Sequence, residues 1–199
     1  MKKVFLGAAL FSVSQVFAAI TPSLVSVTPT GSQFTWTYSV NLAQDQNAVG
    51  GPAPAQSTPG GVGVISTTAD YFTIYDFAGF VAGSNTQPAN WSFQSSATGS
   101  TPQDVIPTDT GITNLTWYLN SGTTLVGPQN LGTFSARSIY SLETLANFSG
   151  QGTRNSGTAV GTEISNIGTV GVPSGVPEPG TYALIGGGML ALGVLRRRV

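Results

Sequence analysis

The fold is decided by one stretch, Phe34-Thr35-Trp36-Thr37-Tyr38-Ser39-Val40-Asn41-Leu42. Its even positions are all apolar or aromatic and its odd positions are all polar. Successive side chains of a β-strand point to opposite faces, so alternation over nine residues predicts a strand with one buried face and one solvated face. The aromatic stripe could instead stack on sugars, but packing in a core is the better-supported interpretation.

Further segments of β character lie on both sides of this stretch, separated by turns rich in Gly, Pro and Asn. Strands are predicted within 24–28, 66–81, 91–93, 112–119, 131–140, 142–148 and 162–172. The stretch 44–63 is predicted to be a long exposed loop, and 150–158 a turn region. No central segment has apolar residues at helical spacing. We therefore expect an all-β domain over 19–175, a single antiparallel β-sandwich of Ig-like or jelly-roll-like outline.

The N-terminus has the three parts of a secretory signal peptide. Met1-Lys2-Lys3 supplies a cationic start, 4–11 an apolar run, and Val16-Phe17-Ala18 a small-residue cleavage site. Cleavage after Ala19 would put bulky Phe17 three residues before the cut, which disfavours it. We expect a signal helix within 1–18 and cleavage after Ala18.

The C-terminal segment 176–199 also has three parts in a fixed order. Pro177-Glu178-Pro179 should be extended, because proline fixes its own φ and disfavours helix at the preceding residue. An uncharged apolar run over 181–195 follows, and then Arg196-Arg197-Arg198. A helix of this run would span about 22 Å, short of the roughly 30 Å hydrocarbon core, so it predicts a transient membrane span. The arginines form a membrane stop and keep the C-terminus cytoplasmic.

This arrangement resembles the sorting signal of PEP-CTERM proteins, the exported substrates of exosortases in Gram-negative bacteria that make extracellular polysaccharide. The resemblance covers 176–199 only. It implies that an exosortase-like membrane protease recognises Pro177, Glu178 and Pro179, with Glu178 as the recognition carboxylate. It also implies cleavage near this motif and delivery to the cell surface or to an extracellular polysaccharide (biofilm) matrix.

The composition of 19–175 excludes several classes of function. This segment has two basic and seven acidic residues, no lysine and a net charge of −5, so it has no cationic surface for nucleic acid. Ser and Thr are abundant, which suits contact with neutral, hydroxyl-rich polymers. The chain has no cysteine or histidine, so disulfides, thiol chemistry and histidine general bases are excluded.

Carboxylates are the remaining candidates for chemistry. Asp76 interrupts an apolar strand context; it is either a calcium or catalytic carboxylate or, as we prefer, a hydrogen-bond acceptor at a strand end. Asp104 and Asp109 share a loop and could bind Ca²⁺, but no calcium-loop spacing is present. Asp70 and Asp76 lie about 20 Å apart on an extended strand, too far for a glycosidase pair. We expect no catalytic residue, no metal and no cofactor.

These observations predict an exported, non-catalytic protein of the surface or extracellular matrix, tethered briefly through 181–195 and processed at its C-terminal motif. A first alternative is a secreted carbohydrate-binding module, or lectin, that uses exposed aromatic residues such as Trp91, Trp117 or Tyr118. A second is a secreted hydrolase, which would need two carboxylates meeting in a cleft.

Overall fold

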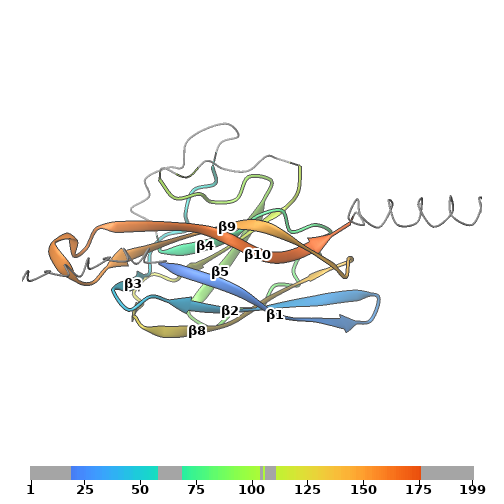
Figure 1. The fold of residues 1–199 in the computed structure, drawn as a ribbon, viewed down its shortest axis with the longest axis horizontal. Helices are drawn as coiled ribbons and strands as arrows, with labels where there is room; N and C mark the ends of the chain where they lie inside the picture. The colour runs from blue at the N-terminus through green and yellow to red at the C-terminus, as the bar shows by residue number, and fades with distance from the viewer. Residues whose placement is uncertain (1–18, 58–68, 104, 106–110, 176–199) are drawn as a thin grey trace, which may run out of the picture.

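The computed structural model describes residues 19–57, 69–103, 105 and 111–175, which form two facing antiparallel β-sheets (Figure 1). The predicted single antiparallel β-sandwich is confirmed. Helix in these residues is limited to one 3-10 turn, η1 (Gly157–Ala159). The predicted signal helix within 1–18 and the C-terminal helix over 181–195 lie outside the described residues.

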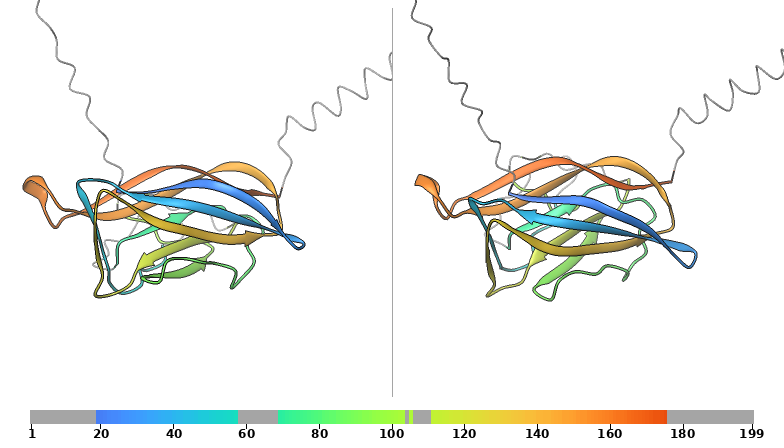
Figure 2. Two further views of the ribbon diagram at one scale, coloured as in Figure 1. Left: turned by 90° about the horizontal axis from the view of Figure 1, so that it is seen from below. Right: turned by 60° about the horizontal axis from the view of Figure 1, so that its bottom comes forward.

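In Figure 2 the three-stranded sheet lies in front of the green strands of the larger sheet. The smaller sheet has the order β1-β2-β8 and contains β1 (Ile20–Thr30), β2 (Gln33–Leu42) and β8 (Gln129–Ser138). The larger sheet follows the path β5-β6-β4-β9-β3-β7, and β10 pairs with β9. Its strands are β3 (Gln46–Val49), β4 (Tyr71–Ile74), β5 (Trp91–Ser96), β6 (Asn114–Leu119), β7 (Thr124–Val126), β9 (Leu142–Arg154) and β10 (Glu163–Ser174).

The core between the sheets is mainly aromatic. The alternating stretch is β2, and its even residues from Trp36 to Leu42 are buried as predicted. Phe72 of β4 stacks on Trp117 of β6 at a ring-centroid distance of 5.3 Å and meets Phe134 of β8 edge-on at 5.0 Å. Rings from both sheets therefore interlock, and this contact is favourable beyond the area it buries.

Two predictions about loops were wrong. The stretch 44–63 contains β3, which pairs with β7 and with the end of β9. The stretch 150–158 is not a turn throughout, because β9 continues to Arg154. Backbone pairing on both edges of β9, with β10 on one side and with β4 and β3 on the other, maintains the strand through its glycines.

A second buried layer covers the outer face of the larger sheet, and this layer is polar. Tyr75 is its centre: its hydroxyl lies 2.7 Å from Ser149 Oγ, 2.9 Å from Thr101 Oγ1 and 3.2 Å from the Ser100 carbonyl. Thr73 Oγ1 also donates to the Ser100 carbonyl, at 2.6 Å. The segment 97–101 therefore covers the sheet through hydrogen bonds rather than through apolar contacts.

Candidate functional site

The described chain ends where the predicted sorting signal begins. Ser174, the last residue of β10, pairs with Leu142 of β9. Gly175 then passes so close to the Tyr140 ring that an added Cβ would lie 2.8 Å from its Cζ. The predicted motif residues Pro177, Glu178 and Pro179 and the arginines Arg196, Arg197 and Arg198 lie outside the described residues, as does Ala18 at the other end.

Few residues separate the folded body from the motif. Pro177 is three residues beyond Ser174, so it lies at most about 10 Å from the end of the sheet. The Tyr140 position is itself held, because the Trp36 indole N–H donates to the Tyr140 carbonyl at 3.2 Å. A protease that binds the motif would therefore work next to this end of the sandwich.

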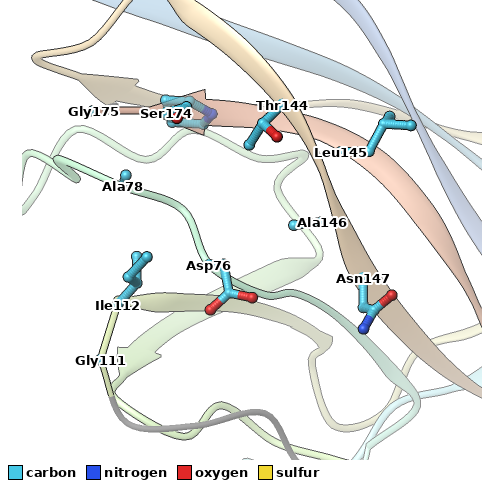
Figure 3. Close-up of a pocket in the computed structure, with 11 residues that line it drawn as sticks. Asp76, Ala78, Gly111, Ile112, Thr144, Leu145, Ala146, Asn147, Ser174 and Gly175 are labelled. Carbon is cyan, nitrogen blue, oxygen red and sulfur yellow. The ribbon is translucent and has the colours of Figure 1, made fainter. Parts of the chain in front are cut away.

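A recess of about 610 Å³ lies at this end, and we call it the exit recess. Figure 3 shows Asp76, from the segment after β4, across from Thr144 of β9 and Ser174 of β10. Its lining residues are Asp76, Ala78, Gly111, Ile112, Thr144, Leu145, Ala146, Asn147, Pro173, Ser174 and Gly175. Hydroxyl, amide and carboxylate groups thus line a recess that also has the exposed apolar side chains of Ile112 and Leu145.

Asp76 enters this recess from a left-handed backbone conformation, with φ of 56°. Such a conformation is uncommon for any residue except glycine, although Asp tolerates it. Asn114 stabilises it, since its Oδ1 accepts the Asp76 N–H at 2.8 Å. The predicted position at a strand end is correct, because Asp76 follows β4 by two residues. Among the described residues no group of three or more acidic side chains could hold a metal ion, and Asp104 and Asp109 lie outside them.

Among the described carboxylates Asp70 has the most unusual environment, and sequence patterning alone did not single it out. It is 2% exposed, and its Oδ2 accepts the Val49 N–H at 2.8 Å and the Thr153 hydroxyl at 2.9 Å. Burial raises the pKa of Asp70 to about 7, and nearby Glu163 adds to the rise, while the Val49 and Thr153 hydrogen bonds oppose it. Burial also raises the pKa of Glu163. The one sequence feature that could have indicated burial of Asp70 is its position directly before the aromatic strand β4.

Asp70 and Glu163, the two carboxylates that influence each other, do not line a common cleft of substrate size. Glu163 lines a recess of only about 80 Å³ together with Gln103 and Gln151, and Asp70 is not in its lining. Among its described lining residues the exit recess has one carboxylate, Asp76. A third recess, lined by Phe80, Ser95 and Ile112 among others, has no carboxylate among its described lining residues. A glycosidase would need a pair of carboxylates about 5 to 9.5 Å apart.

The aromatic residues of the lectin alternative are mostly inside the protein. Trp117 is fully buried and Trp91 is 4% exposed, so neither ring can stack on a sugar. Both belong to the core cluster with Phe72 and Phe134. Tyr118 is partly exposed on the opposite face of β6. The prediction that Trp91 and Trp117 are exposed was therefore wrong, because the alternation of β5 and β6 points these rings at the facing sheet.

Within the described parts of the chain, no helix has the length and hydrophobicity needed to cross a bilayer. The predicted membrane segment 181–195 is not among these parts.

Comparison with known proteins identifies the C-terminal segment. Residues 175–198 match the PEP-CTERM protein-sorting motif, which confirms the resemblance seen in the sequence. This motif indicates an exported protein that an exosortase, a membrane protein, processes and sorts to the cell surface or beyond. No curated protein and no solved structure matches the chain.

Proposed function

Starting from a chain that carries a PEP-CTERM protein-sorting motif at residues 175–198, we propose that its β-sandwich is a non-catalytic module of the cell surface or the extracellular polysaccharide matrix. The motif match is the observation that carries the proposal. The signal peptide 1–18 directs export through the inner membrane, and 181–195 holds the chain in the membrane until the protease cuts near Pro177-Glu178-Pro179. The released body then acts by contact.

The strand order supports an Ig-like sandwich, an architecture common in extracellular modules. In the immunoglobulin fold strands A, B and E share one sheet, and C, F and G share the other. Here the first two strands and β8 form one sheet, while β4, β9 and β10 are neighbours in the other. In chain order, β1, β2 and β8 therefore correspond to A, B and E, and β4, β9 and β10 correspond to C, F and G. Such a likeness supports the architecture but not a particular ligand.

The polar character of the body supports action outside the cell by contact. Its two cations are Arg137 and Arg154, and its solubility depends on Ser, Thr, Asn and Gln. The exit recess presents hydroxyl and amide groups that suit a neutral, hydroxyl-rich polymer. The lectin alternative loses two of its three aromatic residues, since Trp91 and Trp117 are buried. The two larger recesses described above show no carboxylate pair among their described lining residues, so they do not favour the hydrolase alternative.

The test is a substitution in the motif with a matched control in the body. Glu178→Ala removes the only carboxylate of the motif, and Glu143→Ala removes an exposed carboxylate of β9. We expect Glu178→Ala protein to keep its C-terminal tail and to stay with the membrane fraction, while Glu143→Ala protein is processed like wild type. Intact mass and fractionation in the native host measure both results. Normal processing of the Glu178→Ala variant would contradict the assigned role of the motif.

A further inference from the structure

The first described residues are locked inside the folded body. Ala19 and Ile20 are both fully buried. The Asn166 side chain of β10 binds Ile20 on both sides of its backbone: Oδ1 accepts the Ile20 N–H at 3.2 Å, and Nδ2 donates to the Ile20 carbonyl at 3.2 Å. The Ala19 carbonyl accepts the Ala43 N–H, also at 3.2 Å. The start of β1 is therefore fixed at three backbone groups.

Two glycines of β9 make room for this start. An added Cβ on Gly150 would lie 2.6 Å from the Ile20 carbonyl oxygen, and one on Gly152 would lie 3.1 Å from the Ala19 Cβ. Any side chain at Gly150 would clash with the Ile20 backbone, which cannot shift without breaking its hydrogen bonds. These glycines occupy the part of β9 that the sequence led us to expect as a turn, so their structural role is close approach by another segment.

Buried polar atoms without partners occur in Asp45 and Gln46, the second and third residues after the Ala43 that donates to the Ala19 carbonyl. Gln46 is fully buried, and neither its Oε1 nor its Nε2 has a hydrogen-bond partner. A Cβ added to Gly152, which would contact Ala19, would also lie 3.7 Å from Gln46 Oε1. Gln46 Oε1 is therefore near the Ala19 side chain. Asp45 Oδ1 is likewise buried and without a partner, while Asp45 Oδ2 faces Arg154 at 3.8 Å. Both residues follow Ala43 in the turn that holds the Ala19 carbonyl.

Asp45 Oδ1 and Gln46 Oε1 are buried acceptors without partners, and a buried acceptor of this kind calls for a donor. We propose that Asp45 and Gln46 form a socket for the α-ammonium group of Ala19 that signal-peptide cleavage creates. Hydrolysis of the Ala18–Ala19 peptide bond consumes one water, leaves a carboxylate on Ala18 and produces an ammonium on Ala19. This ammonium brings positive charge and new N–H donors to a carboxylate oxygen and an amide oxygen. Removal of the signal peptide thereby completes the fold.

This inference rests on the export step of the proposed function and does not involve C-terminal sorting. Lys2 and Lys3 are the only lysines of the chain. After cleavage at Ala18, the α-amine of Ala19 is therefore the only primary amine in the protein. An amine-reactive succinimidyl ester reports on this one group without interference from side chains.

The experiment compares exported wild-type protein with a variant that has one serine inserted between Ala18 and Ala19. The insertion keeps the cleavage site and moves the amine about 3.5 Å outward. We expect the wild-type amine to be labelled about tenfold more slowly at pH 8, because a neighbouring carboxylate raises the pKa of the amine and leaves less of its neutral, reactive form. In urea both proteins should be labelled at one rate.

Two substitutions test the socket itself. Asp45→Asn removes the carboxylate, and Gln46→Met keeps the side-chain length but removes the amide. Both should bring the labelling rate toward that of the insertion variant while circular dichroism remains that of a folded β protein. The proposal would be overturned if wild type and insertion variant were labelled at equal rates, or if both substituted proteins were labelled as slowly as wild type. It would also be overturned if N-terminal sequencing found a first residue other than Ala19. None of these results bears on the role of Glu178 in sorting.

Discussion

At the scale of single residues, Asp70 shows how burial can outweigh hydrogen bonding. Its carboxylate accepts two hydrogen bonds, from Val49 and Thr153, and these favour the charged form. Loss of hydration favours the neutral form more strongly and raises the pKa to about 7 from the ordinary value of 3.8. The structure therefore holds a carboxyl group that changes charge near neutral pH.

This predicts that the stability of the protein depends on pH through Asp70. Because the pKa is higher in the folded state, the folded protein binds more protons than the unfolded chain between about pH 4 and pH 7. The free energy of unfolding should therefore fall as pH rises through this range, by an upper limit of about 4 kcal/mol. Urea unfolding at pH 4.5, 6 and 8 measures it.

Asp70→Asn is the matched control for that experiment, because it keeps an acceptor oxygen for Val49 and Thr153 but cannot ionise. The stability difference between wild type and this variant should shift in favour of the variant as pH rises. Burial also raises the pKa of Glu163, so some pH dependence of the same sign should remain in the variant. A difference between the two proteins that is constant from pH 4.5 to 8 would show that Asp70 titrates normally.

At the scale of structural elements, the larger sheet is covered on its outer face by a polar segment. The Tyr75 hydroxyl connects Ser149 on β9 to Ser100 and Thr101 in that segment. Gln94 of β5 adds a hydrogen bond from its Nε2 to Ser100 Oγ at 2.9 Å. A polar network of this kind stabilises only while every member is paired.

Tyr75→Phe should therefore destabilise the protein by about 1–3 kcal/mol, since it leaves buried hydroxyl and carbonyl groups with fewer partners. The change in amide hydrogen exchange should be greatest over 97–101, because this segment depends on the network more than β4 itself does. Tyr118→Phe, on the partly exposed tyrosine of β6, serves as the control and should change stability by less than about 0.5 kcal/mol. Equal losses in the two variants would mean that the buried Tyr75 hydroxyl contributes no more to stability than the hydroxyl of a partly exposed tyrosine.

At the scale of the whole molecule, the ends of the described chain lie at opposite ends of the sandwich (Figure 1). The start of β1 lies beside Asn166, near the beginning of β10, whereas β10 itself ends at Ser174 beside Leu142. The sorting motif follows Ser174 directly, with no flexible linker in the sequence. The body should therefore hinder access of a membrane protease to the motif.

This arrangement predicts that a longer connection speeds C-terminal processing. Insertion of eight Gly and Ser residues between Gly175 and Val176 would separate the motif from the sandwich by about 15 Å on average. Pulse-chase labelling in the native host should show faster conversion to the mature mass. The same insertion between Ser121 and Gly122, in the turn after β6, is the control and should leave the rate unchanged. Slower processing after the first insertion would mean that the protease also needs the body nearby.

The sequence alone determined the β class, the alternating strand β2 and the sorting motif. These depend on local patterns: period-two alternation places Trp36 and Tyr38 in the core whatever the topology, and the motif is recognised from the order of its residues. The sequence could not identify β3, β7 or the second half of β9, because short or glycine-containing strands are maintained by pairing with distant segments.

Which polar groups matter depends on contacts between segments that are far apart in the chain. Asp70 and Gln46 look ordinary in the sequence, and Trp91 and Trp117 look available to a sugar. Their roles follow from what covers them: Val49 and Thr153 enclose Asp70, the start of β1 lies beside Gln46, and Phe134 packs on both tryptophans. Burial is a property of segments brought together from far apart in the chain, and it sets both the cost of an unpaired polar group and the pKa of a carboxylate.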